Sequence, residues 1–303
     1  MSKSLSIANA WPWAVFALTP LFFSTNLIFG RGIIFDVAPF TIAFLRWAGC
    51  LIVLLPIIIR EKGTVTPFLK HHFSFWLMLG FLGMWICGAI VYMALQTTTA
   101  INSALVYTTS PLFVIIIQFL WTKRPIKLQE IIGIVAATIG VCYIVLKGEL
   151  EQLLALNLNF GDLLILGCAV SWALYLILQK TDAGKDVPSF AMLGLMAAAG
   201  TILLAPFAAF ELFSGARMPT TQSAWLSIGG IVFFSSLLAF SGTQHTIKHL
   251  GPAISSMALY LLPVYGVLLA VIMLDEKYHT YHFIGSVLVL GGVIVATLPK
   301  KLK

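Results

Sequence analysis

A charged side chain lies deep within an apolar stretch of this sequence, and its type limits the chemistry it can do. Arg46 follows the start of the apolar run 38–59 by about 8 residues, or about 12 Å along a helix. A central arginine costs about 2.5 to 3.5 kcal/mol on membrane-insertion scales, so it needs a partner or water. Two roles fit: an anchor for a carboxylate or phosphate of a ligand, or an internal brace bonded to carbonyls and hydroxyls of neighbouring helices.

Uncharged polar and aromatic side chains within other apolar runs form a second group of candidates. Aromatic rings with a few convergent polar groups suit a ligand that is partly apolar. The same hydroxyls and amides can instead join helices, at about 0.6 kcal/mol each, and a buried tryptophan can simply be a core residue. The predicted ligand-binding residues are Asn26, Gln96, Asn102, Tyr107, Trp172, Tyr175 and Tyr260.

Catalytic and metal chemistry find little support in the sequence. No Asp or Glu lies well inside an apolar run, and His245, the one candidate for proton coupling, is interpreted as an interfacial residue. The turn 275–282 combines acidic residues and histidines without a dedicated ligand spacing. Four cysteines without metal-like spacing lie in apolar runs: Cys50, Cys87, Cys142 and Cys168. We therefore expect no enzyme activity, no metal and no cofactor.

The elements that must position these residues follow from the composition. The chain is 60% hydrophobic and 10% charged, whereas globular chains are about 25% charged. Each apolar run can cross about 30 Å of hydrocarbon as a helix. The ten runs are 11–29, 38–59, 73–95, 100–121, 128–146, 160–179, 188–210, 224–243, 252–274 and 283–298. The sequence predicts an all-α integral membrane protein with ten transmembrane helices.

The distribution of Lys and Arg predicts how this protein lies in the membrane. With both termini on the cytoplasmic side, 13 of the 18 basic residues fall in cytoplasmic segments, 4 fall on the other side, and Arg46 lies within a helix. This bias satisfies the positive-inside rule. The net charge of +7 is scattered over short loops, so it does not indicate a nucleic-acid partner.

An internal repeat organises the ten runs. Segment 103–140 superimposes without a gap on segment 255–292, 152 residues later, and the aligned pairs are Ser103/Ser255, Pro111/Pro263, Gly133/Gly285 and Gly140/Gly292. Five crossings per half is an odd number, so the repeat is inverted in the membrane. We expect repeats at 1–150 and 151–303, helix breaks at Pro111 and Pro263 that permit gating, and close helix packing at the glycines. Because the first and sixth helices are equivalent members of the two repeats, a ligand-binding role is favoured for Asn26, Trp172 and Tyr175.

Short motifs along the whole chain carry a family resemblance. They are Phe44-Leu45-Arg46-Trp47-Ala48, Ala94-Leu95, Pro111, Pro252, Pro263, Glu276 and Ile284-Gly285. In order and spacing the chain resembles ten-helix members of the drug/metabolite transporter superfamily with two EamA repeats. It departs from them at Lys123-Arg124, where family repeats commonly carry a glutamate, and at Met196, which aligns with Arg46.

The resemblance implies a secondary transporter in the cytoplasmic (inner) membrane. Family members most often export amino acids, related metabolites or amphipathic compounds through a central cavity, and some import metabolites. We expect a transporter of small polar or zwitterionic metabolites that works by alternating access as an exporter. The alternative is an uptake carrier or exchanger for a nucleoside-like, vitamin or sulfonium compound, and a membrane-embedded enzyme is a more distant one. The expected partners are the substrate and membrane lipid, and a monomer is compatible with the sequence.

Overall fold

The computed structural model describes residues 7–31, 33, 35–98, 100–149, 159–274 and 277–298, and these residues form helices and no strand. The first half contains α1 (Ile7–Arg31), α2 (Pro39–Arg60), α3 (Lys62–His71), α4 (Phe73–Gly80), η1 (Phe81–Ile90), α5 (Val91–Ala94), α6 (Ala100–Tyr107), α7 (Ser110–Thr122) and α8 (Leu128–Val145). The second half contains α9 (Phe160–Leu178), η3 (Asp182–Gly184), α10 (Ser189–Phe213), α11 (Gln222–Gly230), η4 (Ile231–Leu238), α12 (Ala239–Leu250), α13 (Pro252–Met257), η5 (Ala258–Leu261), α14 (Leu262–Leu274) and α15 (Thr280–Thr297).

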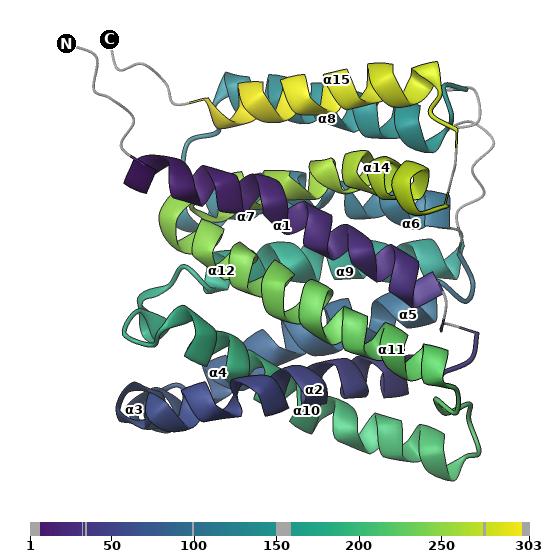
Figure 1. Ribbon diagram of the computed structural model, residues 1–303. Helices are drawn as coiled ribbons and strands as arrows, with labels where there is room; N and C mark the ends of the chain where they lie inside the picture. Colours follow the sequence, from purple (N-terminus) through teal and green to yellow (C-terminus); the bar gives the residue numbers. More distant parts are fainter. Residues whose placement is uncertain are drawn as a thin grey trace.

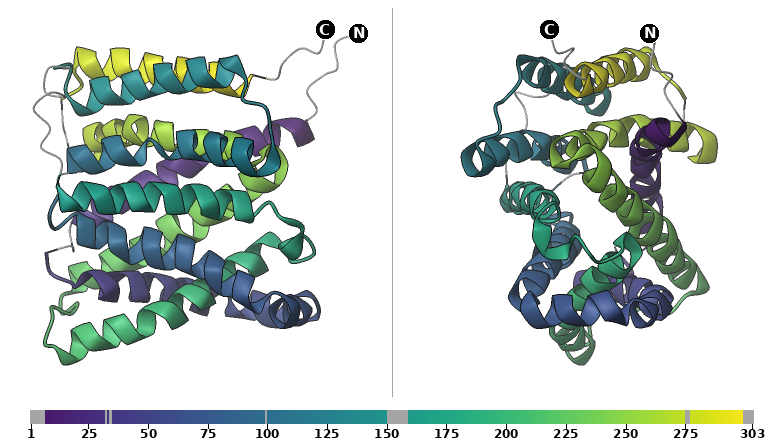
Figure 2. Two further views of the ribbon diagram at one scale, coloured as in Figure 1. Left: turned by 180° about the vertical axis from the view of Figure 1, so that it is seen from behind. Right: turned by 90° about the vertical axis from the view of Figure 1, so that its left-hand side faces the viewer.

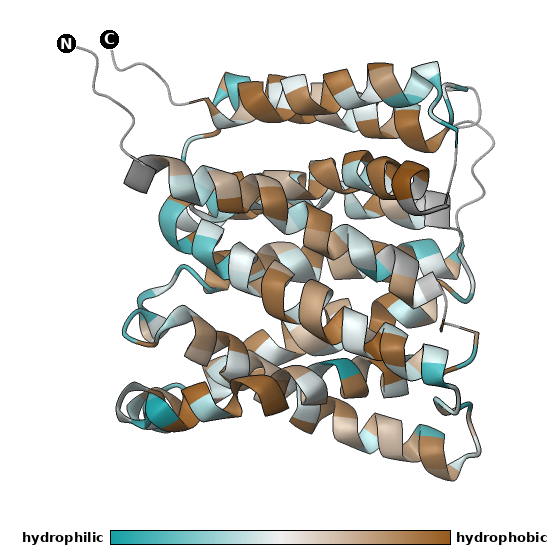
Figure 3. Cartoon of the chain, viewed as in Figure 1, coloured by the Kyte–Doolittle hydropathy of each residue, from teal (hydrophilic) through white to brown (hydrophobic). Residues whose placement is uncertain are grey.

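The helices combine into spans that run side by side through one bundle (Figure 1). Over the described residues, nine continuous segments are long and apolar enough to cross a membrane, and α1, with 25 residues, adds a tenth. Many large apolar side chains of the spans are exposed, while hydrophilic residues gather in the loops at the two ends of the bundle (Figure 3). The predicted fold class, an all-α membrane protein of ten spans, is confirmed.

The observed bounds differ from the predicted runs mainly in the eighth span. That span, formed by α11, η4 and α12, continues to Leu250 rather than ending near residue 243. Helix carbonyls within it accept the hydroxyls of Thr243 and Thr246, so these polar side chains fit inside the bundle. The structure also contains α3, a short helix between the second and third spans that the hydropathy pattern does not predict. Its Val65 and Phe68 are buried, so a two-residue apolar face was sufficient to fix it.

The last helices of the two halves show the repeat directly. α14 begins and ends 152 residues after α7 does, and α15 begins and ends 152 residues after α8 does. α8 and α15 lie side by side in opposite directions along one edge of the bundle (Figure 2). A Cβ added to Gly292 would lie 2.6 Å from the Gly133 carbonyl oxygen, and one added to Gly285 would lie 2.8 Å from that of Gly140. The four aligned glycines therefore form one pseudo-symmetric contact, in which helix backbones touch.

The spans that carry the aligned prolines are interrupted at equivalent places. A turn at Thr108 and Thr109 separates α6 from α7, and the 3-10 segment η5 separates α13 from α14. Pro111 and Pro263 are each the second residue of the helix that follows. A proline is tolerated there because the N–H groups of a first turn have no helical partner.

Equivalent carbonyls hold these interrupted spans in place. Ser110 donates its hydroxyl to the Ala169 carbonyl of α9 at 3.0 Å, and Tyr265 donates to the Ala17 carbonyl of α1 at 2.7 Å. Ala17 and Ala169 are also 152 residues apart. Each half thus fastens its broken helix to the first helix of the other half, which joins the two repeats at their centre.

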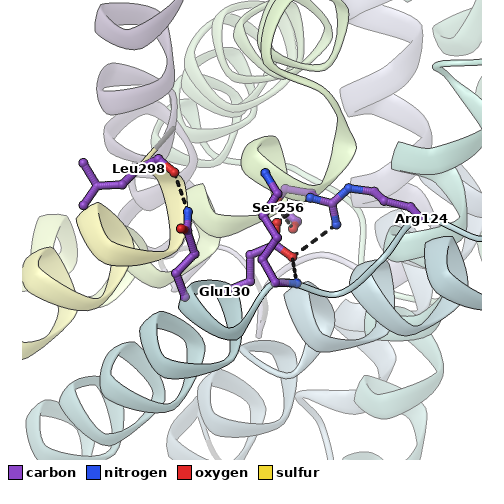
Figure 4. Close-up of polar contacts among 7 residues, drawn as sticks. Arg124, Glu130, Ser256 and Leu298 are labelled. Atoms are coloured by element: carbon purple, nitrogen blue, oxygen red, sulfur yellow. Dashed lines mark hydrogen bonds and ion pairs between the residues drawn. The ribbon is translucent and has the colours of Figure 1, made fainter. Parts of the chain in front are cut away.

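One end of the bundle, named here the basic end, carries most of the described Lys and Arg residues. It comprises the α2–α4, α7–α8 and α9–α10 connections and the end of α12, with Arg60, Lys62, Lys70, Lys123, Arg124, Lys127, Lys180, Lys185 and Lys248. There the buried carboxylate of Glu130 pairs with Arg124 and accepts the Lys127 backbone N–H at 3.2 Å. Figure 4 shows this pair, together with the bond that Gln129 of the same helix donates to the Leu298 carbonyl. This network caps the start of α8 and fixes the loop that precedes it.

Candidate functional site

Arg46 lies inside the bundle, where two serines of a π-helical segment receive its hydrogen bonds. Its side chain projects from α2 toward η4 and is 5% exposed. Nε donates to the Ser236 hydroxyl at 2.7 Å, and Nη2 donates to the Ser235 hydroxyl at 3.1 Å. Among the described residues no carboxylate forms an ion pair with Arg46. Hydroxyl and carbonyl groups thus solvate this cation without neutralising it.

The π-helical geometry of η4 positions the two serines that bind Arg46. A π turn widens a helix by one residue and is common at functional sites, and here η1 and η4 occupy the middle of the third and eighth spans. The widened turn in η4 turns two consecutive serine hydroxyls toward Arg46, while Ser236 also bonds the Ile231 carbonyl five residues earlier at 3.2 Å. The equivalent of Arg46 in the second half, Met196, is fully buried, so the cation exists on one side of the repeat only.

Aromatic rings surround Arg46 and centre on Phe240 of α12. The guanidinium carbon lies 4.9 Å from the centroid of Trp47 and 5.6 Å from that of Phe240. Further rings from α1 and α9 pack edge-on around Phe240, at centroid distances of 5.4 Å for Phe23, 5.5 Å for Trp172 and 6.3 Å for Tyr175. We call Phe23, Arg46, Trp47, Trp172, Tyr175 and Phe240 the central cluster; it draws on both halves of the chain.

Several buried polar atoms at the central cluster have no hydrogen-bond partner. They are the indole nitrogen of Trp47, the hydroxyl of Tyr175 and both amide atoms of Gln244, from side chains that are at most 5% exposed. Tyr175 faces the amides of Gln244 and Gln179, yet none of these contacts has the full geometry of a hydrogen bond. Because a buried unpaired polar group costs about 1 to 3 kcal/mol, these donors and acceptors are suited to a polar ligand or to water.

The structure is closed around this cluster. The cavity that Phe23 and Trp172 line, together with hydroxyls of Thr246 and Ser255, has a volume of about 10 Å³, which is room for about one water molecule. A molecule of the size of an amino acid needs the surrounding helices to move apart. The interrupted spans are the neighbours that can allow this, since Leu259 and Leu262, at the η5–α14 break, line the same cavity.

The structure brings together three of the residues singled out in the sequence: Arg46, Trp172 and Tyr175. Others have local partners elsewhere in the bundle. Tyr92 donates to the Asn26 amide oxygen at 3.2 Å, and Thr138 donates to the Tyr260 hydroxyl at 3.2 Å. Asn26 therefore joins α1 to α5, and Tyr260 joins η5 to α8, so both act as links between helices in this closed arrangement.

The remaining predicted residues lie at other positions. Tyr107 ends α6 and faces Cys87 of η1. Gln96 is exposed in the turn after α5, at the end of the bundle opposite the basic end. The side chain of Asn102 lies outside the described residues. Among the described residues no three His, Cys, Asp or Glu side chains are grouped to hold a metal ion, and positions 275 and 276 are not among them.

Sequence reasoning missed three members of the site: Trp47, Phe240 and Gln244. Phe240 carries no periodic or motif signal in a chain with 22 phenylalanines. Gln244 lies directly after the predicted eighth run, which stops at residue 243, although an amide within an apolar helix is itself a signal. The register of Arg46 against η4 depends on a contact between residues 190 positions apart.

Comparison with known proteins identifies the family. The sequence profile of the EamA-like transporter family matches residues 11–146 and again residues 159–298. The chain belongs to this family. Both matches together cover most of the sequence, and the resemblance to EamA-type drug/metabolite transporters noted above is confirmed.

Relatives from bacteria and archaea agree with this assignment. An uncharacterized transporter of Archaeoglobus fulgidus is 28% identical over 298 residues, covering 95% of this chain and 98% of the relative. The uncharacterized transporter YyaM of Bacillus subtilis is 25% identical, covering 88% and 89%. The uncharacterized inner membrane transporter YedA of Escherichia coli K12 is 25% identical, covering 95% and 91%. A solved crystal structure with 18% identity superimposes with a TM-score of 0.74 over 93% of this chain and 95% of the other.

This EamA-like protein is thus a multi-pass membrane transporter whose substrate is a small molecule and whose surroundings are membrane lipid. The solved structure supports the fold alone, because its identity is low.

Proposed function

We propose that this EamA-like protein is a secondary transporter of small amphipathic organic solutes that carry a carboxylate, such as amino acids and related zwitterionic metabolites, and that it exports them. The observation that carries the proposal is the central cluster. There a buried arginine, which no acidic residue of the described segments pairs with, lies among aromatic rings and beside unpaired amide, indole and hydroxyl groups. A substrate carboxylate would neutralise Arg46, and an apolar side chain would pack against Trp172 and Phe240.

Alternating access between the repeats 1–150 and 151–303 is the proposed mechanism. In inverted-repeat transporters the site lies between two halves that exchange conformations. The central cluster takes residues from both halves, and the bonds of Ser110 and Tyr265 fasten each broken helix to the opposite half. Exchange of conformation between the halves then opens the cluster to one side at a time. We place the basic end and both termini in the cytoplasm because of the Lys and Arg bias.

Transport by purified protein in proteoliposomes tests this function. Vesicles are loaded with an unlabelled amino acid, and entry of labelled amino acids and common metabolites is followed by counterflow, with and without a proton gradient. We expect selective exchange of carboxylate-bearing solutes and little effect of the gradient, because the described spans hold no acidic residue at the central cluster. Movement of cationic or uncharged solutes only would overturn the substrate class, and right-side-out cell vesicles report the direction.

Replacing both Pro111 and Pro263 by alanine is expected to slow transport by about ten-fold, or about 1.4 kcal/mol of barrier. Alanine restores the backbone N–H groups that proline removes, so each interrupted span can close into a continuous and stiffer helix. Counterflow rates at saturating solute measure the effect, and the single variants show whether both breaks contribute. Unchanged rates in the double variant would contradict a gating role for these breaks.

Gln244→Met is expected to make the protein more stable and less active. The variant removes a buried amide that has no partner in the closed state, and this removal should raise the free energy of unfolding by about 1 kcal/mol. It also removes a contact to the ligand, and this loss should lower the transport rate about ten-fold. Gln118→Met is the matched control, because Gln118 of α7 is also buried with an unpaired amide oxygen. It should gain stability without losing transport. Equal transport rates for Gln244→Met and Gln118→Met would show that Gln244 does not contact the substrate.

A further inference from the structure

A second cavity lies apart from the central cluster, toward the end of the bundle opposite the basic end. Its volume is about 390 Å³, which is within the range of ligand pockets. It is formed by the start of α2, the η1–α5 part of the third span and the end of α10. The lining residues are Phe40, Trp85, Ile90, Met93, Phe207, Phe210 and Glu211. None of them belongs to the central cluster.

Aromatic rings form most of the wall of this cavity, which we call the side pocket. The Phe40 and Phe207 rings stack at a centroid distance of 5.0 Å, and Trp85 stands against Phe207 at 5.3 Å. Phe210, 74% exposed, lies at the mouth. Because α10 is an outer helix of the bundle (Figure 2), an exposed ring on its flank faces lipid. The side pocket is therefore open to a molecule dissolved in the membrane.

A carboxylate completes the side pocket. Glu211 accepts the backbone N–H of Phe40 at 3.1 Å on Oε1, and the N–H and hydroxyl of Thr41 at 2.7 and 2.8 Å on Oε2. These bonds cap the start of α2, because the carboxylate oxygens accept N–H groups of its first turn. Among the described residues Glu211 forms no ion pair, and Oε1 retains a free acceptor position. A negative charge without a cation thus lies at the wall of an aromatic pocket.

We propose that the side pocket binds an amphipathic organic ammonium ion that enters from the lipid. The cation would lie against the ring faces, which attract ammonium groups within about 6 Å, and would supply the missing counter-charge for Glu211. The apolar part of the molecule would lie against Ile90, Met93 and Phe210. Neither the direction of transport nor the substrate of the central cluster enters this inference.

The charge of the pocket decides between an ammonium ion and other occupants. An anion is repelled by Glu211. A neutral hydrocarbon, such as a lipid tail, gains contact with the rings but leaves the carboxylate without a counter-ion. An ammonium ion gains both interactions, so affinity should depend on the positive charge at constant shape.

Benzyltrimethylammonium and neopentylbenzene test this dependence, because they have the same shape and differ in the charged nitrogen. Binding of each labelled compound to the purified full-length protein is measured by equilibrium dialysis in dodecyl maltoside, with protein-free micelles as the blank. We expect saturable binding of the ammonium compound, at least about ten-fold tighter than that of the neutral one. Glu211→Gln should lower the affinity for the ammonium compound about ten-fold and leave the affinity for the neutral compound unchanged.

Two further variants keep the test decisive. Phe210→Ala removes a ring at the mouth of the pocket, and because this ring is exposed the variant should still fold. It should lower the affinity for the ammonium compound several-fold. Glu149→Gln is the matched control, because Glu149 is an exposed carboxylate at the same end of the bundle but not in the pocket, and it should have no effect. Equal affinity for the two compounds, equal losses in Glu211→Gln and Glu149→Gln, or no saturable binding would each overturn the proposal.

Discussion

Arg46→Met is expected to lower transport of a carboxylate-bearing solute by about ten- to a hundred-fold, while the folded protein remains at least as stable as the original. Hydrogen bonds to charged groups contribute about 1.5 to 3 kcal/mol, which converts to this range of affinity. Methionine is the residue that the second half already holds, fully buried, at the equivalent position 196. An apolar residue in place of a buried charge is often neutral or stabilising.

The double variant Ser235→Ala/Ser236→Ala separates the two roles of Arg46. It keeps the cation and removes the hydroxyls that hold it, so it should lower the thermal unfolding temperature while leaving discrimination by charge intact. Transport of an amino acid and of its carboxamide analogue is compared in both variants. If Arg46 anchors the carboxylate, Arg46→Met loses the acid selectively. If Arg46 is only a brace, both variants lose stability and transport both solutes equally poorly.

Local signals were sufficient to predict most of the fold. Ten apolar runs of membrane length predicted the spans within a few residues, except at the end of the eighth, and the coincidence of Pro111 with Pro263 predicted two interrupted helices. The aligned glycines predicted close packing, and a symmetric contact between Gly133 and Gly292 is what the structure contains. These features depend on residues that are near in sequence, or on prolines and glycines that occur at equivalent positions of both repeats.

The candidate site was less predictable because it depends on contacts between distant residues. Ser235 and Ser236 meet Arg46 only because η4 widens into a π turn, and no residue pattern within 231–238 specifies that turn. Tyr260 and Asn26 have the polar groups expected of a site, yet each has a partner in a neighbouring helix. Conversely, Trp47 and Phe240 look like core residues in the sequence, and it is the cation next to both rings that distinguishes them.

Gly292→Ala is expected to lower the thermal unfolding temperature of the purified protein by about 2 to 10 °C, whereas Gly291→Ala should leave it unchanged or raise it slightly. The added Cβ of residue 292 would lie 2.5 Å from the Ala137 backbone nitrogen and 2.6 Å from the Gly133 carbonyl oxygen, while nothing lies within 4 Å of that of residue 291. Backbone atoms cannot rotate away as side chains can, so α8 and α15 must separate.

The adjacent glycine makes this a matched experiment, because both variants exchange the same residue types in the same helix. Alanine favours the helix over glycine by about 1 kcal/mol at either position, so the difference between the two variants isolates the contact with α8. Gly133→Ala should reproduce the effect from the other side, and combining it with Gly292→Ala should cost less than the sum, since both changes break one contact. Equal unfolding temperatures for Gly291→Ala and Gly292→Ala would mean that α8 and α15 do not pack backbone to backbone, and another contact would then have to join the last helices of the two halves.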